Sequence, residues 1–287
     1  MSAIQRVVDR GDLADAGKAT WPVLHCGDQG KGQGDAVTGT VEANLLDASA
    51  NSTPGGTNRE VVVGIRSRNV AVEVENPLFT VDELCLRDVD GVVISGNGRR
   101  WLGQTTAADE LLLDRAVAPV LDIGCGPGRH LLALARRGVA ALGLDVTPSA
   151  VRLARSRGAT VLQRSIFEPV AKSGTWSTAL LLDGNIGIGG DPRALLARVS
   201  AVIRPGGRIL TELGPPDVAD VSGRARVDHH GCLGPWFNWA TVGAASLEAI
   251  AAAAGMQVSH TWRIGERWFA EIETATTPPL AQVVPQQ

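Results

Sequence analysis

The 287-residue sequence has few cysteines and no long apolar run. Its four cysteines lie far apart and form no C-x-x-C pair, so their spacing indicates no disulfide framework. The longest apolar stretch, residues 249–254, is far too short to span a bilayer. The first ten residues are polar and lack the apolar core of a secretory signal. We therefore expect a cytoplasmic protein with reduced thiols and no membrane association.

An excess of positive charge is also absent. The net charge is −3 and the isoelectric point is about 6.0, whereas a nucleic-acid-binding domain usually has a basic patch or a pI above about 9. The arginine-rich stretches 136–137 and 152–157 fall on predicted helices, where we interpret them as solvated faces. Contents of 44% hydrophobic and 20% charged residues are typical of a globular domain, and we expect no nucleic-acid partner.

The chain divides by composition into four predicted parts. These are an N-terminal extension (1–58), a β-rich lead-in (59–104), a main domain (105–273) and a tail (274–287). The extension is rich in glycine and polar residues without periodicity, and the tail contains prolines, so both are expected to be disordered. The lead-in holds β-branched runs at 61–65 and 70–74, followed by a hairpin pattern around Asp90-Gly91.

From residue 105 onward, helices alternate with apolar strands. Thr106 and Asp109 form a capping-box pattern that opens a helix predicted over 107–117. The predicted strands are 119–124, 140–144, 160–163, 177–182 and 208–213. Because helices separate them, these strands should pair in parallel, in a sheet covered on both faces. Residues 214–242 look irregular, and the domain ends with a helix at 244–254 and two antiparallel strands at 258–262 and 267–273.

A glycine-rich turn joins the first core strand to the helix behind it. Residues 120–130 read Val-Leu-Asp-Ile-Gly-Cys-Gly-Pro-Gly-Arg-His, with glycines at 124, 126 and 128. Glycine lets the backbone turn tightly and approach a ligand, and the helix N-terminus behind it offers unpaired N–H groups. The pattern favours a nucleotide-like ligand, with a plain strand-to-helix turn as the alternative.

Polar residues end the next strands at the same edge of the sheet, where open α/β folds bind their ligands. Asp145 closes the second strand about 20 residues beyond the loop, where an acidic residue can accept both hydroxyls of a ribose. A turn or helix-capping role is the alternative, because Thr147 and Pro148 follow directly. Asp183 closes the fourth strand and should lie in the same cluster.

The glycine spacing distinguishes between two kinds of ligand. A dinucleotide-binding loop has the pattern G-x-G-x-x-G, whereas here the third glycine comes one residue earlier and Arg129 follows it. Asp122, just before the loop, suits a ligand that carries an amino group better than it suits a pyrophosphate.

In these motifs the chain resembles the class I S-adenosylmethionine-dependent methyltransferases. The resemblance rests on residues 122–128, on Gly-Leu-Asp-Val-Thr-Pro at 143–148 and on Arg-Pro-Gly-Gly at 204–207, and it covers about residues 105–273. It implies a Rossmann-like sheet of seven mostly parallel strands, with an antiparallel last strand and helices on both faces. It also implies a methyltransferase that uses S-adenosylmethionine as its cofactor.

The resemblance implies that ten residues line the cofactor site. They are Asp122, Gly124, Cys125, Gly126, Gly128, Asp145, Val146, Ser165, Ile166 and Asp183. The glycine loop would pack against the methionine part and the ribose, Asp122 would help to hold the amino group, and Asp145 would take the ribose hydroxyls. Ser165 and Ile166 would flank the adenine, and Asp183 would lie near the transferring methyl group.

Two departures from the family patterns bear on the ligands. Many members carry an acidic residue after the third strand for the adenine amino group, but this chain has Ser165, so a hydroxyl or backbone contact must serve. The Asn/Asp-Pro-Pro-Tyr motif of enzymes that methylate nucleic-acid bases is missing, since residues 183–186 read Asp-Gly-Asn-Ile and the chain has no tyrosine. We therefore expect a small-molecule acceptor.

The segment 228–239 follows the fifth strand, at the mouth of the expected site. Methyl transfer needs aligned reactants and, at most, a base, for which His230 is the candidate, with a surface or packing role as the alternative. Metal binding by His229, His230 and Cys232 is not expected, because structural zinc sites usually have four ligands at recognisable spacing. The aromatic residues of this segment line either an acceptor pocket or the core: Trp236, Phe237 and Trp239.

Two other functions stay open at this point. An NAD(P)-dependent oxidoreductase would use a similar α/β fold, but the glycine spacing disfavours it. A noncatalytic protein that binds S-adenosylmethionine as a sensor or scaffold would explain why the sequence shows no evident acceptor base.

Overall fold

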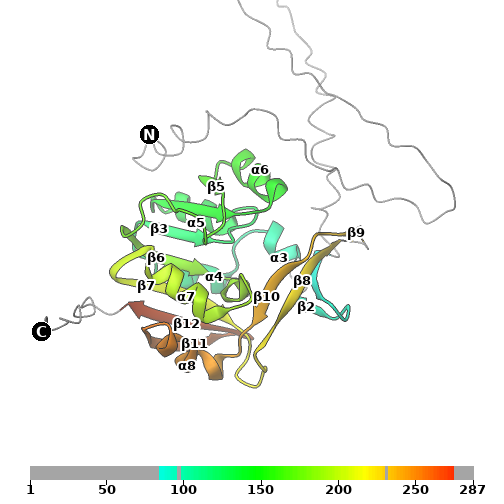
Figure 1. The fold of residues 1–287 in the computed structure, drawn as a ribbon. Coiled ribbons are helices and arrows are strands. Elements are labelled where there is room, and N and C mark those ends of the chain that lie inside the picture. The colour runs from blue at the N-terminus through cyan, green and yellow to red at the C-terminus, as the bar shows by residue number, and fades with distance from the viewer. Residues whose placement is uncertain (1–83, 96–97, 230–231, 275–287) are drawn as a thin grey trace, which may run out of the picture. The chain divides into compact units, whose positions relative to one another are not determined.

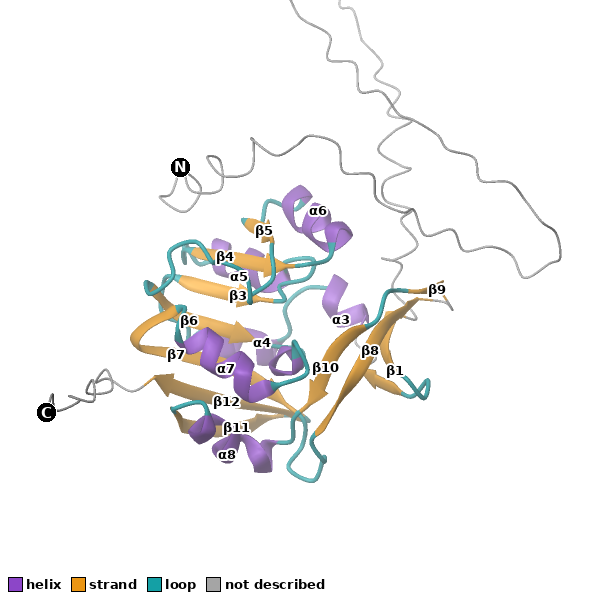
Figure 2. Ribbon diagram, viewed as in Figure 1, coloured by secondary structure: helices purple, strands orange, loops and turns teal. Residues whose placement is uncertain are grey.

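The computed structural model describes residues 84–95, 98–229 and 232–274, which form two β-sheets with helices around them (Figures 1 and 2). The predicted extension 1–58, the β-branched runs at 61–65 and 70–74, the candidate base His230 and the tail from residue 275 lie outside the described residues. No helix among the described residues is long and apolar enough to cross a membrane.

The larger sheet has seven strands in the order β11-β12-β7-β6-β3-β4-β5. They are β3 (Val120–Ile123), β4 (Ala141–Asp145), β5 (Val161–Gln163), β6 (Trp176–Leu181), β7 (Ile203–Leu213), β11 (Met256–Ile264) and β12 (Arg267–Thr274). Strands β7, β6, β3, β4 and β5 pair in parallel, whereas β12 is antiparallel to both of its neighbours, β7 and β11. The sequence-based prediction of a seven-stranded, mostly parallel sheet with an antiparallel last strand is confirmed.

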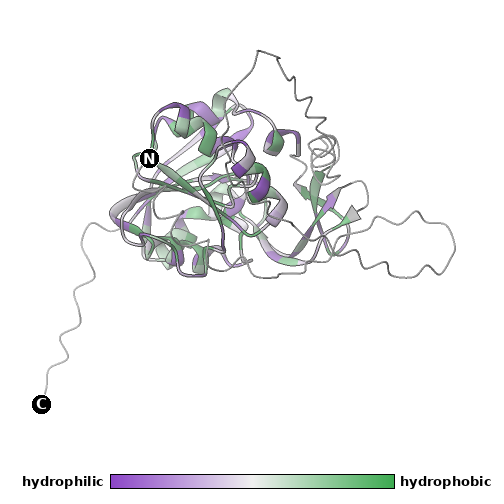
Figure 3. Ribbon diagram, turned by 90° about the horizontal axis from the view of Figure 1, so that it is seen from above, coloured by the Kyte–Doolittle hydropathy of each residue, from purple (hydrophilic) through white to green (hydrophobic). Residues whose placement is uncertain are grey.

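Helices cover both faces of this sheet because its central strands are apolar on both faces. Alternate residues of β3 point to opposite sides: Leu121 packs with α7 (Pro192–Ser200) and α8 (Leu247–Ala253), and Val120 packs with α4 (Ala107–Leu113) and α5 (Arg129–Arg136). The helix α6 (Pro148–Ser156) packs with α5 beside β4 and β5. Figure 3 shows that the strands carry mostly hydrophobic residues, whereas the helices carry both kinds.

Several element boundaries differ from the prediction. The capping box of Thr106 and Asp109 is present, but α4 ends at Leu113 instead of 117. Thr147 stands at the N-cap of α6, yet its side chain makes no capping hydrogen bond. The turn at 204–207 lies within the longer strand β7, as a bulge between the residues that pair with Trp176 and Thr178.

A second sheet is formed in part by residues 214–242, which the sequence predicted to be irregular, so that prediction was wrong. Its antiparallel strands are β1 (Leu84–Asp88), β2 (Val93–Ser95), β8 (Val221–His229), β9 (Cys232–Leu233) and β10 (Phe237–Thr241). The predicted hairpin around Gly91 is confirmed as β1 and β2. In Figure 2 this sheet stands on the side to which the arrowheads of β3 and β6 point, near the short helix α3 (Gly98–Leu102).

Candidate active site

All three glycines of the loop after β3 have a left-handed backbone conformation. Gly124, Gly126 and Gly128 have φ of +71°, +53° and +83°, a region that side chains rarely adopt. A Cβ on Gly124 would lie 2.6 Å from the Asn185 amide nitrogen, which donates hydrogen bonds of 2.9 Å to the carbonyls of Ile123 and Gly124. A Cβ on Gly126 would meet no atom of the described residues within 4 Å, so a ligand can approach the backbone there.

Asp145 joins the end of β4 to this loop. One carboxylate oxygen accepts the Gly126 N–H (2.8 Å) and the other accepts the Thr147 N–H (2.8 Å). Burial raises the pKa of Asp145, although these backbone hydrogen bonds oppose the rise. Asp145 therefore has the turn-forming role, and its carboxylate is also an acceptor group to which a ribose hydroxyl could donate.

Four predicted cofactor residues around the loop differ in which of their atoms face outward. The Cys125 side chain is 7% exposed and packs in a core cluster with Leu131 and Val151, so only its backbone is accessible to a ligand. Ile166 is likewise 2% exposed and belongs to the main core. Val146 is 63% exposed, and the Ser165 hydroxyl accepts the N–H of Phe167 at 3.2 Å.

Asp122 is buried beneath the loop in an unusual electrostatic environment. Among the described residues its Oδ2 has no hydrogen-bond partner, and it lies 3.8 Å from Nδ1 of His130, whose Nε2 lies 3.6 Å from Asp109. Burial raises the pKa of Asp122 to about 6, although the charges of His130 and Arg129 oppose the rise. An orphaned buried carboxylate next to the loop can stabilise a cationic ligand, which is consistent with the amino group or sulfonium of the expected cofactor.

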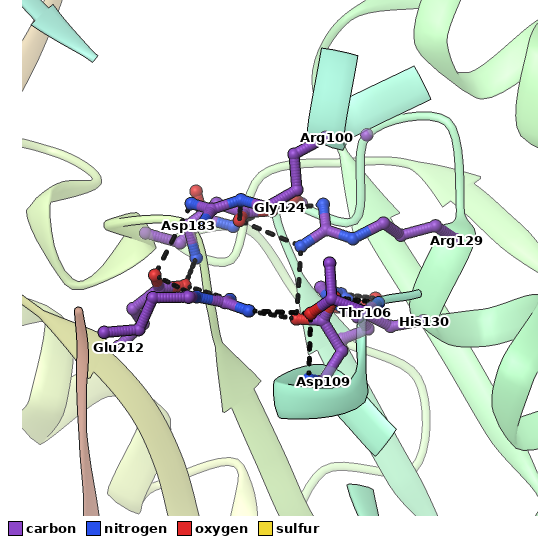
Figure 4. A network of polar contacts seen from close by, with 12 residues as sticks. Arg100, Thr106, Asp109, Gly124, Arg129, His130, Asp183 and Glu212 are labelled. Atoms are coloured by element: carbon purple, nitrogen blue, oxygen red, sulfur yellow. Dashed lines mark hydrogen bonds and ion pairs between the residues drawn. The ribbon is translucent and has the colours of Figure 1, made fainter. Parts of the chain in front are cut away.

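A network of three arginines and three carboxylates lies at the ends of β6 and β7 (Figure 4). Its members are Arg100, Arg129, Arg267, Asp109, Asp183 and Glu212; we call them the arginine–carboxylate network. Three positive and three negative groups balance within it. Because these groups come from five elements and from the loop after β6, the network joins the lead-in to the main domain.

Asp183 is at the centre of the network. Arg129 donates two hydrogen bonds to it, at 2.6 and 2.9 Å, and the Asp183 N–H donates to Glu212 at 2.9 Å. Burial would raise the pKa of Asp183, but the charge and hydrogen bonds of Arg129 lower it overall, so this carboxylate is ionised at neutral pH. Its backbone has φ of +57°, a conformation that aspartate tolerates better than most residues.

A cavity of about 190 Å³ opens between the network and the second sheet. Its polar end is formed by Arg100, Asp183 and Glu212. The remaining lining is mainly apolar: Ile94, Ile186, Leu213, Trp239, Ala240 and Val242, with Ser95, Thr241 and two glycines. Of the three aromatic residues expected at an acceptor pocket, Trp239 lines this cavity, whereas the Trp236 ring lies against Arg226, with 4.4 Å between guanidinium and ring centre.

Comparison with known proteins identifies the domain around the glycine loop. Residues 120–207 match the family model of a methyltransferase domain. The matched residues belong to a methyltransferase domain, and the seven-stranded sheet that contains them has the topology expected of the class I S-adenosylmethionine-dependent methyltransferases. This result confirms the predicted family, enzyme class and methyl donor. No curated protein matches the chain.

Solved structures show the same fold. An S-adenosylmethionine-dependent methyltransferase from Bacteroides fragilis, in complex with S-adenosyl-L-homocysteine, is 21% identical with a TM-score of 0.58, over 71% of this chain and 94% of that one. A Burkholderia thailandensis 1,6-didemethyltoxoflavin-N1-methyltransferase is 19% identical over 58% and 76% of the two chains, with a TM-score of 0.44. The likeness to the first structure shows the fold of this chain. The second structure is too distant to indicate which acceptor this chain uses.

Sequence reasoning missed most of the arginine–carboxylate network. Arg129 appeared only as the residue after the third glycine, and Arg100, Glu212 and Arg267 were not singled out. The one available signal was position: Glu212 stands near the end of the fifth core strand, at the edge where Asp183 was expected.

Proposed function

We propose that the methyltransferase moves a methyl group from S-adenosylmethionine to a small-molecule acceptor bound in the cavity. The observation that carries this proposal is the placement of the cavity, which meets the domain at Asp183, at the end of β6. Asp183 is the residue expected near the transferring methyl group, so a molecule in the cavity would lie beside the donor.

The residues present fit the proposed donor. The open backbone at Gly126, the carboxylate of Asp145 and the orphaned oxygen of Asp122 offer a surface, ribose acceptors and a negative charge. We assign the ribose hydroxyls to Asp145 and the amino group to Asp183, with Asp122 acting at longer range because it is 1% exposed. Val146 and the Ser165 hydroxyl lie at the ends of β4 and β5, where the adenine is expected.

The chain's own contribution to the reaction is alignment. The sulfonium of the donor supplies an activated methyl group, and a nucleophilic acceptor displaces the thioether. Glu212 fixes the backbone of Asp183, and Arg129 fixes its carboxylate, so the donor's methionine part is bound by a rigid group. Trp239 and its apolar neighbours exclude water from the acceptor's side of the cavity.

Calorimetric titration of S-adenosylmethionine into the full chain and into Asp145→Ala tests the donor site. We expect the substitution to weaken binding by about 10- to 100-fold, because a buried carboxylate that accepts ribose hydroxyls is lost. Asp191→Ala is the matched control: it removes the N-cap of α7, away from the loop, and should lower stability without changing affinity. Equal affinity of Asp145→Ala and the wild type would contradict the assignment.

Acceptor turnover separates an enzyme from a binding protein. Incubation with methyl-labelled S-adenosylmethionine and a metabolite extract should produce S-adenosylhomocysteine and a labelled small molecule, detected by mass spectrometry. Donor binding without any product would favour the sensor or scaffold function. A thermal-shift comparison with NAD(P) tests the oxidoreductase alternative, for which the family match offers no support.

A further inference from the structure

The size of the cavity limits what can enter it. Its volume is about 190 Å³. A protein cavity of about 150 Å³ is large enough to bind benzene, whereas pockets for drug-sized ligands usually measure about 300–1,000 Å³. The part of an acceptor that enters this cavity therefore has about the size of one substituted ring.

The charged groups at the polar end of the cavity are already paired with one another. Asp183 accepts two hydrogen bonds from Arg129. Glu212 accepts two from Arg267, at 2.8 and 2.7 Å. The Arg100 guanidinium lies 3.1 Å from Asp183 and 3.4 Å from Glu212. A charged acceptor would lose hydration on entering and would meet only groups that are already compensated, so the lining favours an uncharged one.

The remaining lining combines aliphatic side chains with one indole. Ile94, Ile186, Leu213 and Val242 form apolar walls, and Trp239 is the aromatic residue among the described residues that line the cavity. An apolar lining of this kind stabilises a ligand by removing its hydrocarbon surface from water. The indole adds a flat surface, on which an aromatic ring packs more favourably than a saturated ring of the same size.

The Trp239 ring is fixed beside the end of β6. The Phe237 ring meets it edge-on, with 5.9 Å between the ring centroids and 78° between the planes. A Cβ on Gly184 would lie 3.7 Å from the indole, so the indole reaches the residue that follows Asp183. A planar molecule packed against the indole would therefore lie next to the place where the methyl group is expected.

We propose that the acceptor presents an uncharged aromatic ring, which enters the cavity and packs against Trp239. This inference rests on the proposed function, because it takes the cavity as the acceptor site. Ser95 on β2 and Thr241 on β10 also line the cavity, and their hydroxyls suit an uncharged polar substituent on the ring.

Methyl transfer to such a ring is balanced without a further reactant. A lone pair on a nitrogen or oxygen of the acceptor forms the new bond to the methyl carbon. The bond from that carbon to the sulfonium breaks, and its electron pair stays on sulfur, which becomes the thioether of S-adenosylhomocysteine. A proton that the attacking atom carries is released to water.

Four small probes test the charge and the aromatic character separately. Benzamide, benzoate and benzamidinium share one planar shape and are neutral, negative and positive, and cyclohexanecarboxamide replaces the aromatic ring of benzamide by a saturated one. Titrations followed by ligand NMR use the full chain saturated with S-adenosylhomocysteine. We expect benzamide to bind with a Kd on the order of 1 mM, as fragments do. Both ions should bind at least about 10-fold more weakly, and cyclohexanecarboxamide about 3- to 10-fold more weakly.

Two tryptophans of the same segment provide a matched pair of variants. Trp239→Leu should remove the preference for benzamide over cyclohexanecarboxamide, whereas Trp239→Phe, which keeps a ring, should retain part of it. Trp236→Leu should keep the wild-type preference, because the Trp236 ring lies against Arg226 and is not among the described residues that line the cavity. Circular dichroism of each variant identifies a folding defect.

Four results would overturn the proposal. Either ion could bind as tightly as benzamide, or cyclohexanecarboxamide could bind as tightly as benzamide. The aromatic preference could persist in a folded Trp239→Leu variant, which would place the probe elsewhere. Benzamide could fail to bind while S-adenosylhomocysteine binds, which would leave the donor site intact. A chain that does not bind S-adenosylhomocysteine instead refutes the proposed function, and this inference with it.

Discussion

Asp122 shows how a single residue at this site reduces the stability of the fold. It is 1% exposed, and its Oδ2 has no hydrogen-bond partner within the described part of the chain. Burial raises its pKa to about 6 in the folded protein, whereas an unfolded aspartate titrates near 3.9. The folded state therefore binds the proton more tightly, and stability falls as pH rises from about 4 to 6 and stays lower above that range.

Asp122→Asn should therefore stabilise the protein at neutral pH, by up to about 3 kcal/mol. The gain in melting temperature over the wild type should be clear at pH 7.5 and should shrink toward pH 4.5, where Asp122 is itself protonated. Thermal melts across this range measure it, with the exposed Asp217→Asn as a control that should shift little at any pH. A gain that does not depend on pH would contradict the titration of Asp122.

The sequence indicated those site residues whose role follows from local spacing. The glycines at 124, 126 and 128 and the acidic residue Asp145 have a recognisable pattern because the loop and the strand ends impose it. Arg100 and Arg267 have no such pattern, since each meets its carboxylates only through the tertiary fold. Arg267, for example, bonds to Asp109, which lies 158 residues away.

At the scale of elements, the short 3₁₀ turn η2 (Asn185–Gly187) lies directly against β10. A Cβ on Gly187 would lie 1.9 Å from the carbonyl oxygen of Ala240, a distance that backbone atoms cannot tolerate. The bridge between Ile188 and Trp239 continues the same contact. This packing positions Trp239 beside Asp183-Gly184, where the cavity lies.

Gly187→Ala should separate η2 from β10 and destabilise the protein by about 1–3 kcal/mol, the range for overpacked sites. Gly223→Ala is the matched control, because it lies on β8 with no atom within 4 Å of the added Cβ and should be close to neutral. Urea denaturation compares the two. Similar midpoints for both variants would show that the η2–β10 contact does not constrain the fold.

The second sheet was missed because its strands lack a clear hydrophobic alternation. In β8 the inward positions include Ala225, which is 0% exposed but small, while arginines and a serine occupy the positions between. A small residue at a buried position looks the same in sequence as one in a loop. The core strands were predicted correctly because their burial on both faces requires near-continuous apolar runs.

At the scale of the whole molecule, Arg267 connects three elements. It donates to Glu212 on β7 and to Asp109 and Thr106 at the start of α4. Both carboxylates are buried, with 9% and 0% of their side chains exposed. Removing this cation would leave two buried negative charges less compensated.

Arg267→Met should therefore cost about 3–5 kcal/mol in the free energy of unfolding, as broken buried ion pairs usually do. Arg263→Met, on the same hairpin, breaks the pair with the largely exposed Glu266 and an exposed hydrogen bond to the Gly265 carbonyl, and should cost less than about 1 kcal/mol. Chemical denaturation of the two variants measures the difference. Equal losses of unfolding free energy in the two variants would show that the buried ion pairs of Arg267 stabilise the protein no more than the exposed pair of Arg263 does.

The pairing of β1 with β8 determines when the site can be completed. Arg87 and Asp228 form an ion pair across these strands although they are 141 residues apart. At ordinary rates of synthesis, β1 leaves the ribosome on the order of ten seconds before its partner exists, and contacts of such long range form slowly. The parallel strands β3 to β7 can begin to collapse during this interval, but the wall of the cavity that holds Trp239 must wait for β10, and the last two strands of the larger sheet, β11 and β12, come later still. The binding place for the acceptor is therefore among the last parts of the molecule to form on a newly made chain.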